Sequence, residues 1–221
     1  MDLLHTAHVP AGDGPFPTIL ALHGWGANAH DLLGLAPLLH GGEALVLSPQ
    51  GPIAFELAPG MSGFGWFPLS SGGPPSPAEF QAGREAVAAF LAEAERRYPV
   101  DRRKIVVMGF SQGGVMAYDL VMNDPDRFCG LVALSSWLPE AVTGPIGKQA
   151  GHENFPVMVM HGTEDPMIPV ARAQESRDAL LRLGVSLAYH EYEMGHEIRP
   201  EALRDLLAWL EDKCLTPIRL A

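Results

Sequence analysis

The sequence predicts an α/β fold with a mostly parallel central sheet that is flanked by helices on both faces. Short runs of apolar, often β-branched residues recur along the chain, and helical patterns lie between them. Most of these runs are apolar at consecutive positions rather than at alternating ones, which is typical of strands buried on both faces of a parallel sheet. Alternating strands and helices indicate a layered α/β architecture.

The expected strands cover nearly the whole chain. They are residues 18–22, 44–48, 104–110, 130–135, 156–160 and 187–192, with a weaker opening strand within 3–9. Residues 76–79, Ser-Pro-Ala-Glu, offer an N-cap, a proline at the first helical position and a glutamate at the third, so a helix should begin there. Pro169 and Pro200 open two more helices, and Gly184 stops the first of these. Two further helices are expected after Asn28 and Ser111.

The organisation favours a single domain over residues 1–221, because there is no internal repeat and no linker. The longest segments without a clear pattern are residues 59–75 and 139–153. Loops at the carboxyl ends of parallel strands help to line ligand sites. The segment between the strands that end near 135 and begin near 156 is too short for a large cap, so we expect an open site.

Composition excludes several classes of protein. Apolar residues make up 47% of the chain and charged residues 19%, which is incompatible with wholesale disorder. With 15 basic and 26 acidic residues the formal charge is −11, so nucleic acid and anionic membrane surfaces are poor partners. No run of about 18 apolar residues occurs, and the N-terminus lacks a secretion-signal pattern. We therefore expect a cytoplasmic protein without integral membrane contact.

Two cysteines, Cys129 and Cys214, allow at most one disulfide, and a cytoplasmic location favours free thiols. No Cys/His spacing resembles a zinc site, so no metal is expected.

Residues 109–113, Gly-Phe-Ser-Gln-Gly, fit the pattern G-x-S-x-G between an expected strand and an expected helix. In that context the serine is held at the tip of a sharp, strained turn. Small residues are needed two positions on either side, and Gly109 and Gly113 meet that need. We interpret Ser111 as a nucleophile; the alternative is an ordinary Gly-rich turn.

A serine nucleophile needs a base, and the base needs an orienting acid, in the order Ser, acid, His. Asp165 lies on the loop that leaves the strand 156–160, with Glu164 as the rival acid. Pro166 favours Asp165, because a proline restricts the backbone of the residue before it. For the base, His196 lies in a loop after the strand 187–192, whereas His190 lies inside that strand and is more simply structural.

An acyl-transfer intermediate needs two backbone donors for its oxyanion. The amide of Gln112, directly after the nucleophile, is the first. The loop at 23–26, His-Gly-Trp-Gly, follows a strand and supplies the amide of Trp25 as the second. This chemistry needs no metal and no organic cofactor.

Five blocks together resemble the small carboxylesterase, lysophospholipase and acyl-protein thioesterase family of the α/β-hydrolases. They are residues 22–26, 60–61 with 66–67, 109–114, 161–166 and 194–198. The resemblance implies a Ser111, Asp165 and His196 triad and hydrolysis of carboxylic esters, and in some members of thioesters or lysophospholipids. Two positions depart from the family pattern, since Ala27 and Pro68 stand where the family often has aspartate. Both border the expected acyl site.

The expected walls of the acyl site are Trp66, Phe67, Met167 and Ile168, although the same residues could instead anchor the core. Trp25 could narrow the site towards short acyl groups. Three functions follow: a carboxylesterase for small short- to medium-chain esters, a thioesterase or lysophospholipase for longer acyl chains, or a non-catalytic receptor of the same fold. The intact triad argues against the receptor. A homodimer is an assembly that the sequence neither requires nor excludes.

Overall fold

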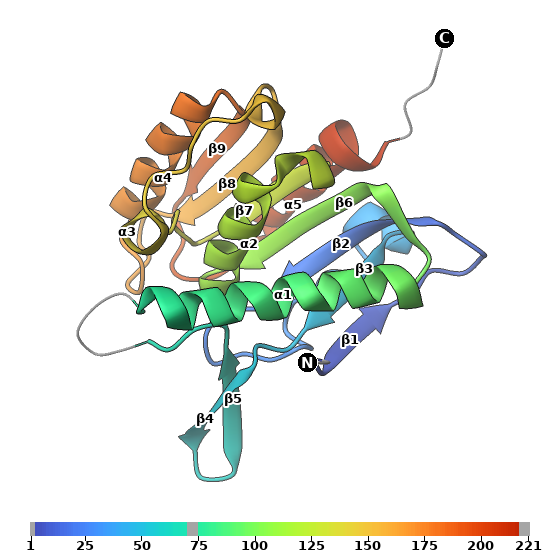
Figure 1. Cartoon of the computed structure of the whole chain (residues 1–221), viewed down its shortest axis with the longest axis horizontal. Helices are drawn as coiled ribbons and strands as arrows, with labels where there is room; N and C mark the ends of the chain where they lie inside the picture. Colours follow the sequence, from blue (N-terminus) through green and yellow to red (C-terminus); the bar gives the residue numbers. More distant parts are fainter. Residues whose placement is uncertain (1–2, 70–74, 217–221) are drawn as a thin grey trace.

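The computed structural model describes residues 3–69 and 75–216. Within them one seven-stranded sheet has the order β1-β3-β2-β6-β7-β8-β9 (Figure 1). Its strands are β1 (His5–His8), β2 (Phe16–Leu22), β3 (Leu45–Pro49), β6 (Val100–Phe110), β7 (Gly130–Leu134), β8 (Pro156–Gly162) and β9 (Ser186–Tyr192). Only β1 runs antiparallel to its neighbour in this sheet. The expected mostly parallel sheet is thus confirmed.

Helices cover both faces of the sheet, as predicted. On one face lie α1 (Pro77–Arg97), α2 (Gln112–Asn123) and α4 (Val170–Leu183), and on the other lie α5 (Pro200–Leu210) and the π-helical turn η5 (Glu211–Leu215) (Figure 1). Each face has its own apolar cluster between sheet and helices. Strand residues alternate between the two clusters, which explains why the strands are apolar at consecutive positions.

Local signals place the ends of these helices. Ser76 and Glu79 form the predicted capping box at the start of α1. Gly184 ends α4 in the left-handed conformation, with φ at 86°. Near its start α1 packs closely against the backbone at Trp66, since a Cβ on Gly83 would lie 2.4 Å from the carbonyl oxygen of Trp66.

The helix expected after Asn28 is wrong. The chain forms two short 3₁₀ turns instead, η1 (Leu32–Leu35) and η2 (Leu39–Gly42). Pro37 stands between them and cannot donate a helical hydrogen bond. His40, Gly41 and Gly42 then take positive φ, which ends any helix.

The segment 59–75 also differs from the expectation, because part of it is a strand. Strands β4 (Ile53–Ala58) and β5 (Met61–Gly65) pair as an antiparallel hairpin that projects from the body of the molecule (Figure 1). Residues 70–74 lie outside the described residues.

The second predicted loop, 139–153, contains α3 (Glu140–Thr143) and the 3₁₀ turn η4 (Ala150–His152). The segment from β7 to β8 therefore holds no cap domain. In the described part of the chain no helix is long and apolar enough to cross a membrane.

Candidate active site

Ser111 occupies a strained turn between β6 and α2. Its φ of 52° and ψ of −120° are rare for a residue with a side chain. Its backbone N–H donates to the carbonyl of Leu134 at 2.8 Å, which ties the turn to β7. The turn places the hydroxyl at the carboxyl end of the sheet and at the N-terminus of α2, where backbone N–H groups without helical partners favour negative charge.

The two flanking glycines are required by close backbone contacts. A Cβ on Gly109 would lie 2.2 Å from the carbonyl oxygen of Gly113. A Cβ on Gly113 would lie 2.0 Å from the carbonyl oxygen of Leu22. Alanine at either position forces the backbone apart, so the predicted steric reason for these glycines holds.

The structure brings His196 to Asp165 and leaves the rival Glu164 apart. His196 lies between β9 and α5, and its Nδ1 donates to Oδ2 of Asp165 at 2.7 Å. Glu164 is exposed, and only its backbone N–H is bonded, to the carbonyl of Met194. His190 lies within β9, as expected for a structural histidine.

Asp165 is held in its ionised form despite a buried side chain. The backbone N–H groups of Met167 and Ile168 donate to Oδ1 at 2.8 and 2.9 Å. Burial opposes ionisation, but the hydrogen bonds from His196 and from these two amides outweigh it and hold the pKa of Asp165 below its usual value. An ionised Asp165 keeps the proton of His196 on Nδ1, so Nε2 is the nitrogen with the free lone pair.

The His196 ring lies beside the nucleophile turn. It packs on the ring of Phe110, the residue before Ser111, with centroids 4.8 Å apart. Within the described residues neither the Ser111 hydroxyl nor Nε2 of His196 makes a hydrogen bond. The structure thus leaves the expected hydrogen bond between serine and histidine unformed, and such contacts often tighten only when substrate binds.

The two predicted oxyanion donors are both free. Neither the backbone N–H of Trp25 nor that of Gln112 donates a hydrogen bond to another described residue. Gln112 is buried at the first position of α2, where an N–H without a partner is unusual. Gly24 brings the loop close, since a Cβ on it would lie 3.3 Å from Cβ of Ser111.

Buried polar contacts fix this oxyanion loop. Nδ1 of His23 donates to the carbonyl of Gly24, and its Nε2 accepts from the N–H of Gly51. Burial lowers the pKa of His23, so the ring stays neutral. The indole of Trp66 donates to the carbonyl of His23 at 2.8 Å.

Trp66 lies in the apolar core, which is the second of the two roles expected for it. Its side chain is fully buried, and its backbone N–H donates to the side-chain carbonyl of Gln112 at 2.8 Å. The same amide group of Gln112 donates to the carbonyl of Phe67 at 2.7 Å. Trp66 therefore holds the oxyanion loop in position through these hydrogen bonds. A tryptophan in a Gly-rich segment gives no sequence signal that separates these two roles.

The β4–β5 hairpin packs against the oxyanion loop at residues 25–27. The ring of Phe55 stacks on Trp25, with centroids 4.1 Å apart. The backbones of Gly26 and Phe64 are joined at 2.9 Å, and the N–H of Phe64 donates to Ala27 at 3.0 Å. No signal in the sequence pointed to this contact, because no strand is expected over either half of the hairpin.

An apolar cavity of about 490 Å³ adjoins Asp165 and Gln112, because three of its lining residues hydrogen-bond to their side chains. Phe67, Met167 and Ile168 line it, and Met167 is 71% exposed at its edge. Sequence analysis did not identify its other lining residues. They include Leu69, Phe80, Val115, Trp137, Val142 and Arg172. They come from separate segments, and no motif joins them.

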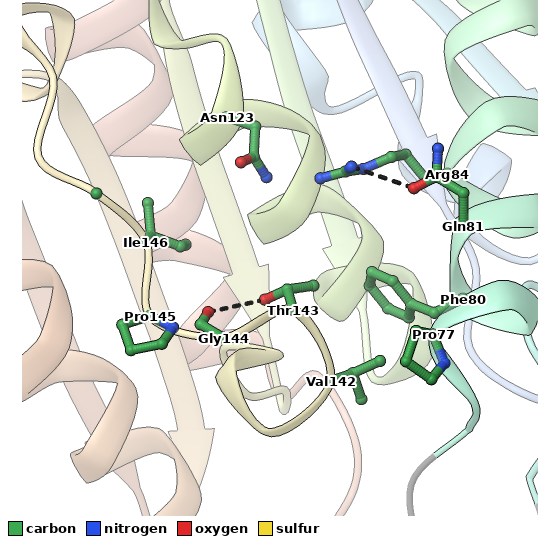
Figure 2. Close-up of a pocket in the computed structure, with 11 residues that line it drawn as sticks. Pro77, Phe80, Gln81, Arg84, Asn123, Val142, Thr143, Gly144, Pro145 and Ile146 are labelled. Carbon is green, nitrogen blue, oxygen red and sulfur yellow. Dashed lines mark hydrogen bonds between the residues drawn. The ribbon is translucent and has the colours of Figure 1, made fainter.

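A second, more polar cavity of about 380 Å³ lies between α1, the end of α2 and the chain after α3. Figure 2 shows Gln81 and Arg84 on one side, with Thr143 and Gly144 across from them. Phe80 and Val142 line both cavities, so the two are neighbours. Arg84 is committed to Asp119 through two hydrogen bonds, which leaves the cavity close to neutral. Among the described residues no cluster of three or more His, Cys, Asp or Glu could hold a metal.

Comparisons with known proteins point to one family of hydrolases. The family model for phospholipase/carboxylesterase matches residues 5–214. Acyl-protein thioesterase 1 from Mycosarcoma maydis is 29% identical over 91% of this chain and 92% of its own. Acyl-protein thioesterase 1 from Gibberella zeae is 36% identical over 48% of this chain, and that match spans 47% of the relative's length. The crystal structure of the Bacillus cereus carboxylesterase superposes with a TM-score of 0.79 at 25% identity, over 96% of this chain and 94% of that one.

Proposed function

Because the chain belongs to the phospholipase/carboxylesterase family of serine hydrolases, we propose that it hydrolyses short- to medium-chain carboxylic esters through an acyl-enzyme on Ser111. The observation that carries the proposal is the 2.7 Å hydrogen bond from His196 to Asp165, which leaves Nε2 as the lone-pair nitrogen beside the serine turn. The free backbone amides of Trp25 and Gln112 then bind the oxyanion.

The reaction follows from these roles. Nε2 of His196 takes the proton of Ser111 as the hydroxyl attacks the ester carbonyl, and Asp165 stabilises the imidazolium that forms. The two amides and the N-terminus of α2 stabilise the negative oxygen. The imidazolium returns its proton to the leaving alcohol, and water then cleaves the acyl-enzyme by the same steps.

A thioesterase or lysophospholipase acting on longer chains is the second candidate. It shares the same chemistry, and the observation that favours it is the apolar cavity of about 490 Å³ beside the site. The partner in both cases is a small ester-type substrate. The series that separates them measures kcat/KM for p-nitrophenyl esters from acetate to palmitate, with matched thioesters. A peak at or below octanoate supports the esterase, and a peak at palmitate or a preference for thioesters supports the second candidate.

The nucleophile is tested directly with a fluorophosphonate probe. We expect labelling of Ser111 in the wild type and a loss of turnover of about 10⁶ in Ser111→Ala. Ser186→Ala is the matched control, because Ser186 is exposed at the start of β9, and its activity should stay within about twofold. Folded wild-type protein that resists the probe would favour a ligand receptor instead.

A further inference from the structure

The two cysteines meet on the face of the sheet that carries α5. Cys129 directly precedes β7, and Cys214 lies in the π-helical turn η5. They are 85 positions apart in sequence, yet both belong to one apolar cluster and both are reduced in this structure. Neither residue contacts the candidate active site, so the proposed function leaves them without a role.

The Cys214 thiol is fixed against the backbone at Cys129. It donates a weak hydrogen bond to the carbonyl of Cys129 at 3.6 Å. It also lies over Gly130, where an added Cβ would be 2.4 Å from the sulfur. The ammonium of Lys104 donates to the carbonyl of Leu215 at 2.8 Å and holds the turn in place.

The two thiols differ in exposure and in acidity. Cys129 is partly exposed, whereas Cys214 is 7% exposed. The neighbouring thiol of Cys214, as a side-chain hydrogen-bonding partner, and the charge of Lys104 lower the pKa of Cys129, although burial and Asp101 oppose this. The same contact, together with burial, raises the pKa of Cys214. A partly exposed thiol with a lowered pKa, next to a second thiol, is the arrangement found in peroxide-sensitive pairs.

We propose that Cys129 and Cys214 form a peroxide-reactive pair that closes to an intramolecular disulfide. The Cys129 thiolate attacks the peroxide, the O–O bond breaks, and Cys129 becomes a sulfenic acid with release of hydroxide. The sulfur of Cys214 then attacks the Cys129 sulfur and displaces a second hydroxide, which takes the Cys214 proton. In total two thiols and one hydrogen peroxide give one disulfide and two water molecules.

The bond would link the chain around the catalytic acid and base. The loop from 129 to 214 contains Asp165 and His196. Closing so long a loop restricts the unfolded chain and raises the temperature of unfolding, by about 5 °C or more. Because neither thiol touches the active site, the folded enzyme should keep its turnover at ambient temperature.

The test treats the reduced, full-length protein with hydrogen peroxide and follows free thiols and intact mass. In the wild type we expect both thiols to disappear together, with a mass loss of about 2 Da, no covalent dimer, a raised Tm, and reversal by dithiothreitol. Peptide mapping separates the cystine from oxidation at the nine methionines.

Two single variants show the order of events. In Cys214→Ser, Cys129 should stop at the sulfenic acid, which dimedone traps. In Cys129→Ser, the remaining buried thiol should react at least about tenfold more slowly than Cys129 does in Cys214→Ser. Retention of both thiols in the wild type, a covalent dimer, or equal reactivity of the two variants would overturn the proposal.

Discussion

Asp165→Asn isolates the role of the carboxylate because the structure dictates how the new amide must lie. Oδ1 of Asp165 accepts two backbone N–H groups, from Met167 and Ile168, so the side-chain carbonyl of asparagine has to occupy that side. Its NH₂ group then faces Nδ1 of His196, where a hydrogen bond of 2.7 Å now reaches Oδ2. Two donors cannot pair, so Nδ1 must give up its proton and Nε2 must carry one. The base then has no lone pair for Ser111.

The expected loss is about 10⁴ in kcat, or about 5 kcal/mol of transition-state stabilisation, with KM little changed. Initial rates on a p-nitrophenyl ester measure it, and a thermal melt close to that of the wild type shows that the fold is intact. Glu164→Gln is the matched control, since that carboxylate is exposed and should change kcat by less than about threefold. If Asp165→Asn kept a tenth of the activity, or if Glu164→Gln were the more damaging change, the assignment of the acid would be wrong.

Four further outcomes follow from the same structure. The pKa of Asp165 is depressed on folding, so its stabilising effect is complete above the unfolded-state pKa of about 3.9 and disappears as the pH falls through the lower folded value. Urea unfolding should therefore show the stability gap between wild type and Asp165→Asn narrowing below about pH 4; a gap that stayed constant would contradict this. Gly113→Ala should abolish activity or folding because its Cβ would meet the carbonyl of Leu22, whereas Gly147→Ala, with open space around it, should melt like the wild type. Arg84→Met should cost about 3–5 kcal/mol in chemical unfolding, because it leaves the buried Asp119 with the amide of Asn123 but without its charged partner, and a loss below about 1 kcal/mol would mean that the pair is dispensable. Val115→Phe narrows the apolar cavity and should lower kcat/KM for palmitate by about tenfold while acetate changes little; equal effects on both esters would place the acyl chain elsewhere.

The sheet could be predicted from the sequence because strands that are buried on both faces are apolar at consecutive positions. The consecutive apolar residues of β6 and β8 are buried from Ile105 and Val157 onward, with neither face open to water. The acid and base followed from chain order and from loops at the carboxyl ends of strands. Chain order leaves Glu164 open as the acid, and the hydrogen bond between His196 and Asp165 favours Asp165.

What could not be predicted depends on contacts between distant segments. The sequence leaves open whether Trp66 lines the acyl site or anchors the core, because an aromatic residue near a Gly-rich loop has the same local pattern in either role. Its actual position depends on the side chain of Gln112, 46 positions away. The β4–β5 hairpin carries mostly exposed residues and owes its shape to pairing with residues 26–27, so the core contributes no periodicity to its sequence.

The hairpin would make the rate of the proposed reaction depend on a part of the protein that projects into solvent. Trp25 carries one of the two proposed oxyanion amides, and its ring and the next two residues contact β4 and β5. Bending the hairpin would shift the backbone N–H of Trp25, whereas the backbone N–H of Gln112 belongs to α2 and would keep its position. A molecule that binds the tip of the hairpin could thus slow turnover without competing with substrate.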